Sequence, residues 1–142
     1  MPNVFENARQ QSGEVRVSAY KLEFEIVGLP KMTNTMRVHW SAKLRHAQLW
    51  KSKVAIKCQL AGKPPTPLAH AALTLTRCSA QEPDFDGLVS GFKSVIDGLV
   101  ECGVLAGDKR SNIGQPQYHW QKVSPNKGKI IVSVEEITKE EK

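Results

Sequence analysis

The chain has 142 residues, 40% of them hydrophobic, and a formal net charge of +6. This length and composition suit one domain that builds its own core. Cys58, Cys78 and Cys102 form no C-x-x-C pair, so the sequence predicts neither a disulfide framework nor a zinc site. No apolar run reaches the roughly 18 residues of a membrane span, and the N-terminus lacks a signal-peptide pattern, so we expect a cytoplasmic protein.

Charge is distributed unevenly along the sequence. No acidic residue lies between Glu25 and Glu82, a stretch rich in lysine and arginine, whereas from Glu82 to Asp108 the acids outnumber a single base, Lys93. The basic segments would attract a polyanion, and an acidic cluster that faces the phosphates of that polyanion would need a bound cation. This arrangement is typical of a nuclease, although lysines that only solvate exposed helix faces would give the same composition.

The first half of the chain predicts a strand followed by a helix. Residues 1–19 are polar without a sustained period, and we expect them to form a flexible arm. Alternation of apolar and charged residues predicts a strand over 21–27. After a loop at 31–39, Ser41 can cap a helix over 41–60 that has one apolar face.

The second half predicts a strand, a helix and a final hairpin. A proline-rich connector at 62–67 ends the preceding helix, because proline lacks an N–H donor and disfavours helix before it. Alternation predicts a strand over 69–78, and apolar spacing predicts a helix over 86–100. The segments 117–123 and 130–137 are expected to be strands that pair as a hairpin.

These elements define the expected fold class. We expect an α/β (α+β) single domain over residues 20–137, with a charged tail at 138–142. Its order is β-α-β-α-β-β, in which a small mixed four-stranded sheet has two helices packed on one face. The open face of the sheet or the helix over 86–100 could mediate association.

The predicted helix over 86–100 carries charge on one face. Its apolar residues recur at spacings of three and four, which builds a buried face. At about 100° per residue, the polar residues of that helix fall on a single stripe: Asp86, Ser90, Lys93 and Asp97.

Three aspartates are candidates for a site that binds a hard cation. Asp84 and Asp86 lie at the start of the helix, and Asp108 follows a short connection after it. Mg²⁺ takes oxygen ligands from a few carboxylates and keeps waters for chemistry. The alternative is structural, since aspartate is a favoured helix cap, and Lys93 with Asp97, four residues later, can form an ordinary surface ion pair.

The same residues carry a family resemblance. The run Asp84-Phe85-Asp86, then Lys93-Ser94-Val95-Ile96-Asp97-Gly98-Leu99, then Asp108 resembles the D-x-D-N-L…K-x-x-x-D-A-L…D-D signature of RusA-type Holliday junction resolvases, most of all their phage-borne branch. The resemblance covers residues 21 to 137. The chain departs from the signature at three positions. Gly87 replaces an asparagine, Gly107 replaces the acid before Asp108, and Ser90 replaces the lysine one turn after the second acid.

The resemblance implies an activity and its residues. It implies a homodimeric, Mg²⁺-dependent endodeoxyribonuclease, with Mn²⁺ as an alternative metal, that resolves four-way DNA junctions in recombination and repair. It also implies that Asp84, Asp86 and Asp108 bind the catalytic metal and that Lys93 assists catalysis. Asp97 could orient Lys93. The products would be nicks with 5′-phosphate and 3′-hydroxyl ends.

Polar and basic residues outside the acidic segment are expected to contact DNA. They would hold phosphates without reading bases, and they are Asn34, Arg37, His39, Lys43, Arg45, Lys109 and Arg110. Two other functions stay open. One is a protein of the same descent that binds branched DNA without cleaving it. The other is a structural or regulatory protein that has no DNA partner.

Overall fold

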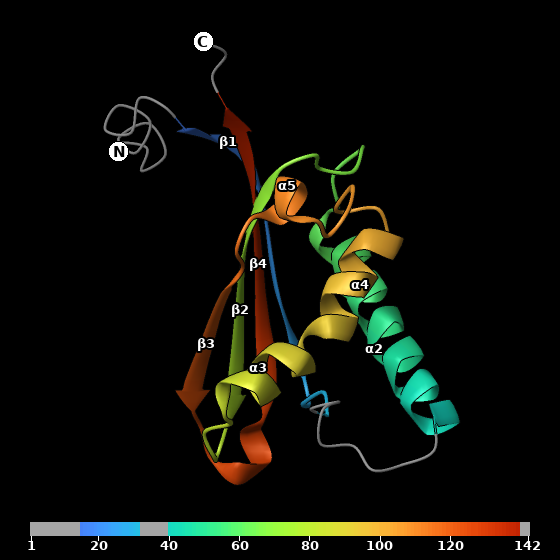
Figure 1. Cartoon of the computed structure of the whole chain (residues 1–142), viewed down its shortest axis with the longest axis vertical. Helices are drawn as coiled ribbons and strands as arrows, with labels where there is room; N and C mark the ends of the chain where they lie inside the picture. Colours follow the sequence, from blue (N-terminus) through green and yellow to red (C-terminus); the bar gives the residue numbers. More distant parts are fainter. Residues whose placement is uncertain (1–14, 32–39, 140–142) are drawn as a thin grey trace.

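The structure, a computed structural model, describes residues 15–31 and 40–139. These residues form a four-stranded mixed sheet with helices along one side, which is the α+β single-domain class that the sequence predicts (Figure 1). In chain order the elements are β1 (Val15–Val27), α2 (Trp40–Ala61), β2 (Ala71–Ser79), α3 (Phe85–Gly91), α4 (Lys93–Glu101), α5 (Arg110–Ile113), β3 (Gln117–Lys122), the 3-10 turn η2 (Pro125–Lys127) and β4 (Lys129–Lys139).

The strand order is β1-β4-β2-β3. β4 lies antiparallel to both β1 and β2, whereas β3 pairs in parallel with β2 at the edge of the sheet. The predicted hairpin of β3 with β4 is therefore wrong. The structure instead places β4 between β1 and β2, where its residues Ile130, Val132 and Val134 are fully buried. The mostly exposed β3 is suited to an edge.

The core lies between the sheet and the helices. Alternate residues of the three long strands point to this side, so the period-two pattern seen in the sequence reports a real buried face. Residues in between are exposed or half-buried on the open face. The strand residues of this core are Leu22, Phe24 and Ile26 of β1, Ala71, Leu73 and Leu75 of β2, and Ile130, Val132 and Val134 of β4.

At one end of the sheet, β1 and β4 both extend beyond the predicted strands. β1 begins at Val15, whose backbone pairs with that of Lys139, so the predicted boundary between a flexible arm and the domain at residue 19 falls inside a strand. The register shifts between Val17 and Lys21, which interrupts the regular ladder there. β4 likewise continues into the segment predicted as a tail.

The helix predicted over 86–100 is two helices. Phe92 separates α3 from α4 with φ −95° and ψ 0°, and its N–H bonds to Val89, three residues back. Gly87 and Gly91 lower the helix propensity just before this point. The break lets the Phe92 ring enter the core, where it is 1% exposed. Asp86 and Ser90 consequently do not share one straight helical stripe with Lys93 and Asp97.

Helix α2 packs on β1 and on α4. Trp50, Val54 and Cys58 form its buried face, whereas Trp40 and Leu44 near its start are exposed. Across residues 15–31 and 40–139, no helix combines the length and apolar character needed to cross a membrane.

Candidate functional site

The candidate site is built within one crossover connection. β2 and β3 are adjacent and parallel, so the chain between Ser79 and Gln117 must return along the sheet before β3 can pair. This crossover contains α3, α4 and α5 together with all three predicted metal ligands. Figure 1 shows it running in front of the sheet from the end of β2 back to the start of β3.

Asp84 is the N-cap of α3. Its backbone is extended, with φ −70° and ψ 167°, and Oδ1 accepts a hydrogen bond from the Gly87 N–H at 2.9 Å. The structural role that the sequence left open is therefore present at Asp84. This cap engages Oδ1, and a carboxylate has two oxygens with about four lone-pair positions, so capping and metal binding are chemically compatible.

Asp86 lies in the first turn of α3 and is exposed. The neighbouring Phe85 ring is 65% exposed and packs edge-on against Tyr118 of β3, with 6.3 Å between the ring centroids. Phe92 contacts the same tyrosine from the core side at 6.1 Å. Through its contact with Phe85, Tyr118 packs the edge strand β3 against the start of α3. Burial raises the pKa of Tyr118, so its phenol stays protonated at neutral pH.

Lys93, Asp97 and Asp108 line one hollow of about 280 Å³, which we call the Lys93–Asp108 hollow. Lys93 and Asp97 come from α4, and Asp108 comes from the loop before α5. The Lys93 ammonium lies 3.8 Å from Asp97 Oδ2, with the two side chains 72% and 30% exposed. The rest of the lining is mainly apolar: Val89, Ile96, Ile113, Gly114, Pro116 and Tyr118.

Backbone pairing fixes the loop that carries Asp108. Leu105 forms a parallel bridge with Leu68, in which Leu68 N–H donates to Val104 O at 2.8 Å and Ala106 N–H donates to Leu68 O at 2.9 Å. On the other side of Asp108, the Asn112 amide donates to Ala69 O at 3.0 Å. These contacts hold Asp108 against the segment that enters β2.

The same packing accounts for Gly107, where the resembling family has an acid. A Cβ at Gly107 would lie 2.6 Å from Asn112 Oδ1, closer than side chains approach one another. An acidic side chain could stand there only if Asn112 moved and released Ala69. In this chain the position beside Asp108 is thus used for close packing.

The three predicted metal ligands are not gathered into one cluster. Asp84, Asp86 and Asp108 all lie in the part of the chain that the structure describes, and that part contains no group of three His, Cys, Asp or Glu side chains placed to hold a metal. Asp108 shares its hollow with Asp97 instead. Asp84 and Asp86 do not line this hollow, and their role as metal ligands stays a prediction.

The predicted DNA contacts fall into three groups. Lys109 and Arg110 are exposed directly after Asp108, at the start of α5. Lys43 and Arg45 lie in the first two turns of α2, where Lys43 is half-buried and Arg45 is exposed. The last group, Asn34, Arg37 and His39, lies outside the described residues. Lys31, the last described residue before that gap, donates its N–H to Nε2 of His46 on α2 at 3.0 Å.

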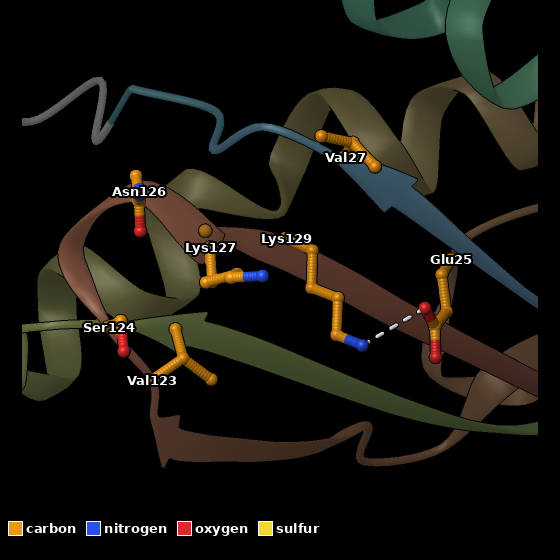
Figure 2. A pocket seen from close by; sticks show the side chains of 8 residues that line it. Glu25, Val27, Val123, Ser124, Asn126, Lys127 and Lys129 are labelled. Atoms are coloured by element: carbon orange, nitrogen blue, oxygen red, sulfur yellow. Dashed lines mark hydrogen bonds and ion pairs between the residues drawn. The ribbon is translucent and has the colours of Figure 1, made fainter.

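Sequence reasoning missed the aromatic wall of the site and a second hollow. Tyr118 could be placed only by knowing that β3 pairs in parallel with β2. Figure 2 shows the second hollow, of about 590 Å³, beside the turn between β3 and β4. Lys129 reaches across it to Glu25, with 3.1 Å between Nζ and Oε1, so much of its positive charge is neutralised. It contains none of the predicted catalytic residues.

Two comparisons with known proteins give no match. No protein-family model matches the chain, and no curated protein matches it.

Proposed function

We propose that the protein is a metal-dependent endonuclease that cleaves branched DNA, acts as a homodimer and has a four-way junction as its substrate. The observation that carries this proposal is the Lys93–Asp108 hollow, where an ammonium and two carboxylates from separate segments converge. Two exposed cations, Lys109 and Arg110, follow Asp108 directly. Phosphoryl transfer needs this combination, because cations hold the phosphate while carboxylates hold a metal.

The donor set of the hollow suits Mg²⁺. Mg²⁺ in proteins is commonly held by one or two carboxylates together with waters and phosphate oxygens, and Asp97 and Asp108 supply that number. Asp84 and Asp86 are the further ligands that the sequence motif proposes. When bound, Mg²⁺ would acidify a water and offset the charge that develops on the phosphate.

Lys93 and its neighbours have distinct roles in this proposal. The exposed Lys93 ammonium would position a phosphate oxygen and stabilise negative charge as it develops. Asp97, 3.8 Å away, would keep that ammonium directed along α4. Lys109 and Arg110 would hold adjacent phosphates, which sets the position of the DNA without reading its sequence. A twofold dimer would present two such sites to a junction of matching symmetry.

A DNA-binding protein that does not cleave is the second candidate function. Two observations favour it. Ser90 and Gly107 stand where the resembling family has charged residues, and a Cβ at Gly107 would lie against Asn112. Such a protein would keep the basic surface and its salt-sensitive affinity for branched DNA.

One experiment separates the two functions. Synthetic four-way junction, linear duplex and single-stranded DNA are incubated with the full chain, with Mg²⁺ or with EDTA, and products are resolved on denaturing gels. We expect nicks in the junction that require Mg²⁺, and junction binding in EDTA that weakens linearly with the logarithm of salt concentration. Binding without cleavage would select the second candidate. The absence of both would reject the DNA hypothesis.

Replacement of Lys93 by alanine is expected to lower junction turnover by about 10²- to 10³-fold, the scale of losing one electrostatic stabiliser of the transition state. Stability should change little, because Lys93 is exposed and exposed ion pairs contribute little. The matched control is Lys21→Ala, which removes an exposed lysine from β1. If the Lys93 variant keeps full activity, Lys93 has no role in cleavage and its 3.8 Å contact with Asp97 is an ordinary surface ion pair.

A further inference from the structure

Three aromatic rings lie in series from the core to the surface beside the Lys93–Asp108 hollow. Phe92 is 1% exposed, and its ring centroid lies 6.1 Å from that of Tyr118, which lines the hollow. On the outer side, the Phe85 centroid lies 6.3 Å from the same tyrosine. Phe85 is the first residue of α3, which Figure 1 shows in front of the sheet. The outermost ring of the series is therefore held against the aromatic wall of the candidate site.

The Phe85 ring is exposed and yet fixed in position. Its plane makes an angle of 86° with that of Tyr118, so the edge of one ring meets the face of the other. Tyr118 therefore covers at most one face of Phe85, and the side chain remains 65% exposed. At the backbone, the cap that Asp84 forms with the Gly87 N–H fixes the first turn of α3. Phe85 thus offers a flat apolar surface that needs little further ordering when a ligand binds.

The charges around Phe85 indicate what kind of ligand this surface suits. Asp84 and Asp86 flank it in the sequence, and both are exposed. A protein partner that buried Phe85 would bury these carboxylates as well, and charged residues are depleted from the centre of protein interfaces. A nucleobase is flat and needs only the open face of the ring, while the carboxylates stay in water or on a cation. The surroundings of Phe85 therefore favour a base over a protein.

The open face of Phe85 selects bases that are not already stacked. Within continuous duplex DNA each base lies between two neighbours, so neither of its faces is free. An unpaired base can leave the stack and place one face on an aromatic side chain, an interaction that tolerates any sequence. The continuous stack is interrupted at a branch point, and unpairing costs least where a base is least well held.

We propose that Phe85 is a base-stacking residue, which receives an unpaired base at the branch point of the DNA while the Lys93–Asp108 hollow holds a neighbouring phosphate. This inference rests on the proposed function, because it names the feature of the substrate that the candidate site recognises. Tyr118 is common to both parts, since it contacts Phe85 and lines the hollow. Stacking on Phe85 would thereby favour branched over linear DNA.

The test measures binding in EDTA, so that it does not depend on cleavage. Affinities of the full chain and of Phe85→Ala are determined for a four-way junction and for linear duplex. We expect Phe85→Ala to weaken junction binding by about 5-fold or more, the scale of losing one stacked base, and to leave duplex binding unchanged. The salt dependence of junction binding should keep its slope, because Phe85 neutralises no phosphate. Leu49→Ala, which removes an exposed apolar side chain from α2, is the matched control and should bind as the wild type does.

A change in the substrate tests the same contact with wild-type protein. A junction with abasic nucleotides at the branch point has no base to offer there, so we expect wild-type protein to bind it about 5-fold or more weakly than the intact junction. Phe85→Ala should bind the abasic and the intact junctions equally, and Phe85→Trp, which keeps an aromatic ring, should retain the discrimination. Wild-type protein that binds the two junctions equally overturns the proposal, whether or not any variant folds.

The outcomes separate this inference from the proposed function. Junction cleavage by the wild type together with unchanged junction binding by Phe85→Ala rejects base stacking and leaves the nuclease proposal standing. Binding that depends on Phe85 and on the branch-point bases, without cleavage, supports stacking within the second candidate function. Wild-type protein that binds no junction rejects both. Loss of the dimer in Phe85→Ala, measured by sedimentation, would assign the ring to a subunit contact and overturn the proposal.

Discussion

Replacement of Asp108 by asparagine is expected to reduce cleavage of junction DNA at least about 10²-fold. Asparagine keeps the size of the side chain but removes the charge, and Asp108 is the predicted ligand that shares a hollow with Lys93. Folding should survive, since Asp108 is exposed and its loop is held by backbone bonds of Leu68 and Leu105. The measurement is a single-turnover cleavage assay beside a thermal melt.

Asparagine variants of the other aspartates identify which carboxylates bind the metal together with Asp108. Asp84→Asn preserves the cap of α3, because asparagine caps helices as well as aspartate does, so any loss of cleavage would be chemical rather than structural. If the sequence motif is correct, Asp84→Asn and Asp86→Asn lose as much activity as Asp108→Asn. If the hollow alone holds the metal, Asp97→Asn takes their place in that set.

Binding provides the control for this series. Each asparagine variant should bind junction DNA at least as tightly as the wild type in metal-free buffer, since each removes a negative charge that repels phosphates. Unchanged cleavage by a folded Asp108→Asn variant would remove Asp108 from catalysis. Unchanged cleavage in all four variants would reject the metal-dependent mechanism.

Replacement of Phe92 by alanine is expected to lower the free energy of unfolding by about 3–5 kcal/mol, the usual cost of deleting a buried phenyl ring. The ring is 1% exposed at the break between α3 and α4, and it supports Tyr118 from the core side. The loss should therefore affect the wall of the hollow as well as the core. The measurement is unfolding by denaturant. The two free energies of unfolding are compared provided that the m-value, the slope of free energy against denaturant concentration, is the same in both proteins.

Phe85→Ala is the matched control for the Phe92 variant. Phe85 contacts the same tyrosine but is 65% exposed, so its removal should cost about 1 kcal/mol or less. Equal losses in the two variants would show that the contact with Tyr118, rather than burial in the core, determines the effect. A small loss for Phe92→Ala would mean that the core closes around the missing ring.

Much of the fold could be predicted because burial leaves a local period in the sequence. Leu22, Phe24 and Ile26 alternate along β1, and Trp50 and Val54 recur at helical spacing in α2. No local pattern in the sequence indicates which strands are neighbours in the sheet. β3 and β4 are adjacent in sequence, and a hairpin is the usual connection between neighbours, but the structure places β4 between β1 and β2.

In the candidate site too, local features could be predicted from the sequence and features that depend on tertiary structure could not. The cap at Asp84 and the pairing of Lys93 with Asp97 are local, and both were among the structural alternatives that the sequence suggested. The distance from Asp84 to Asp108 depends on the break at Phe92 and on the bridge at Leu105, which are tertiary features. Helical periodicity across 86–100 did not predict the break, because the advantage of burying Phe92 outweighs the continuity of the helix.

The parallel pairing of β2 with β3 also affects the order in which the molecule can assemble. Lys93, Asp97 and Asp108 all lie between these two strands, and closing that long loop costs chain entropy before any strand contact compensates for it. The antiparallel β1–β4–β2 part of the sheet does not depend on this closure. The Lys93–Asp108 hollow, in contrast, has no complete wall until Tyr118 docks. This hollow is thus expected to form last during folding, and fraying of the edge strand β3 alone would open it while the rest of the sheet persists.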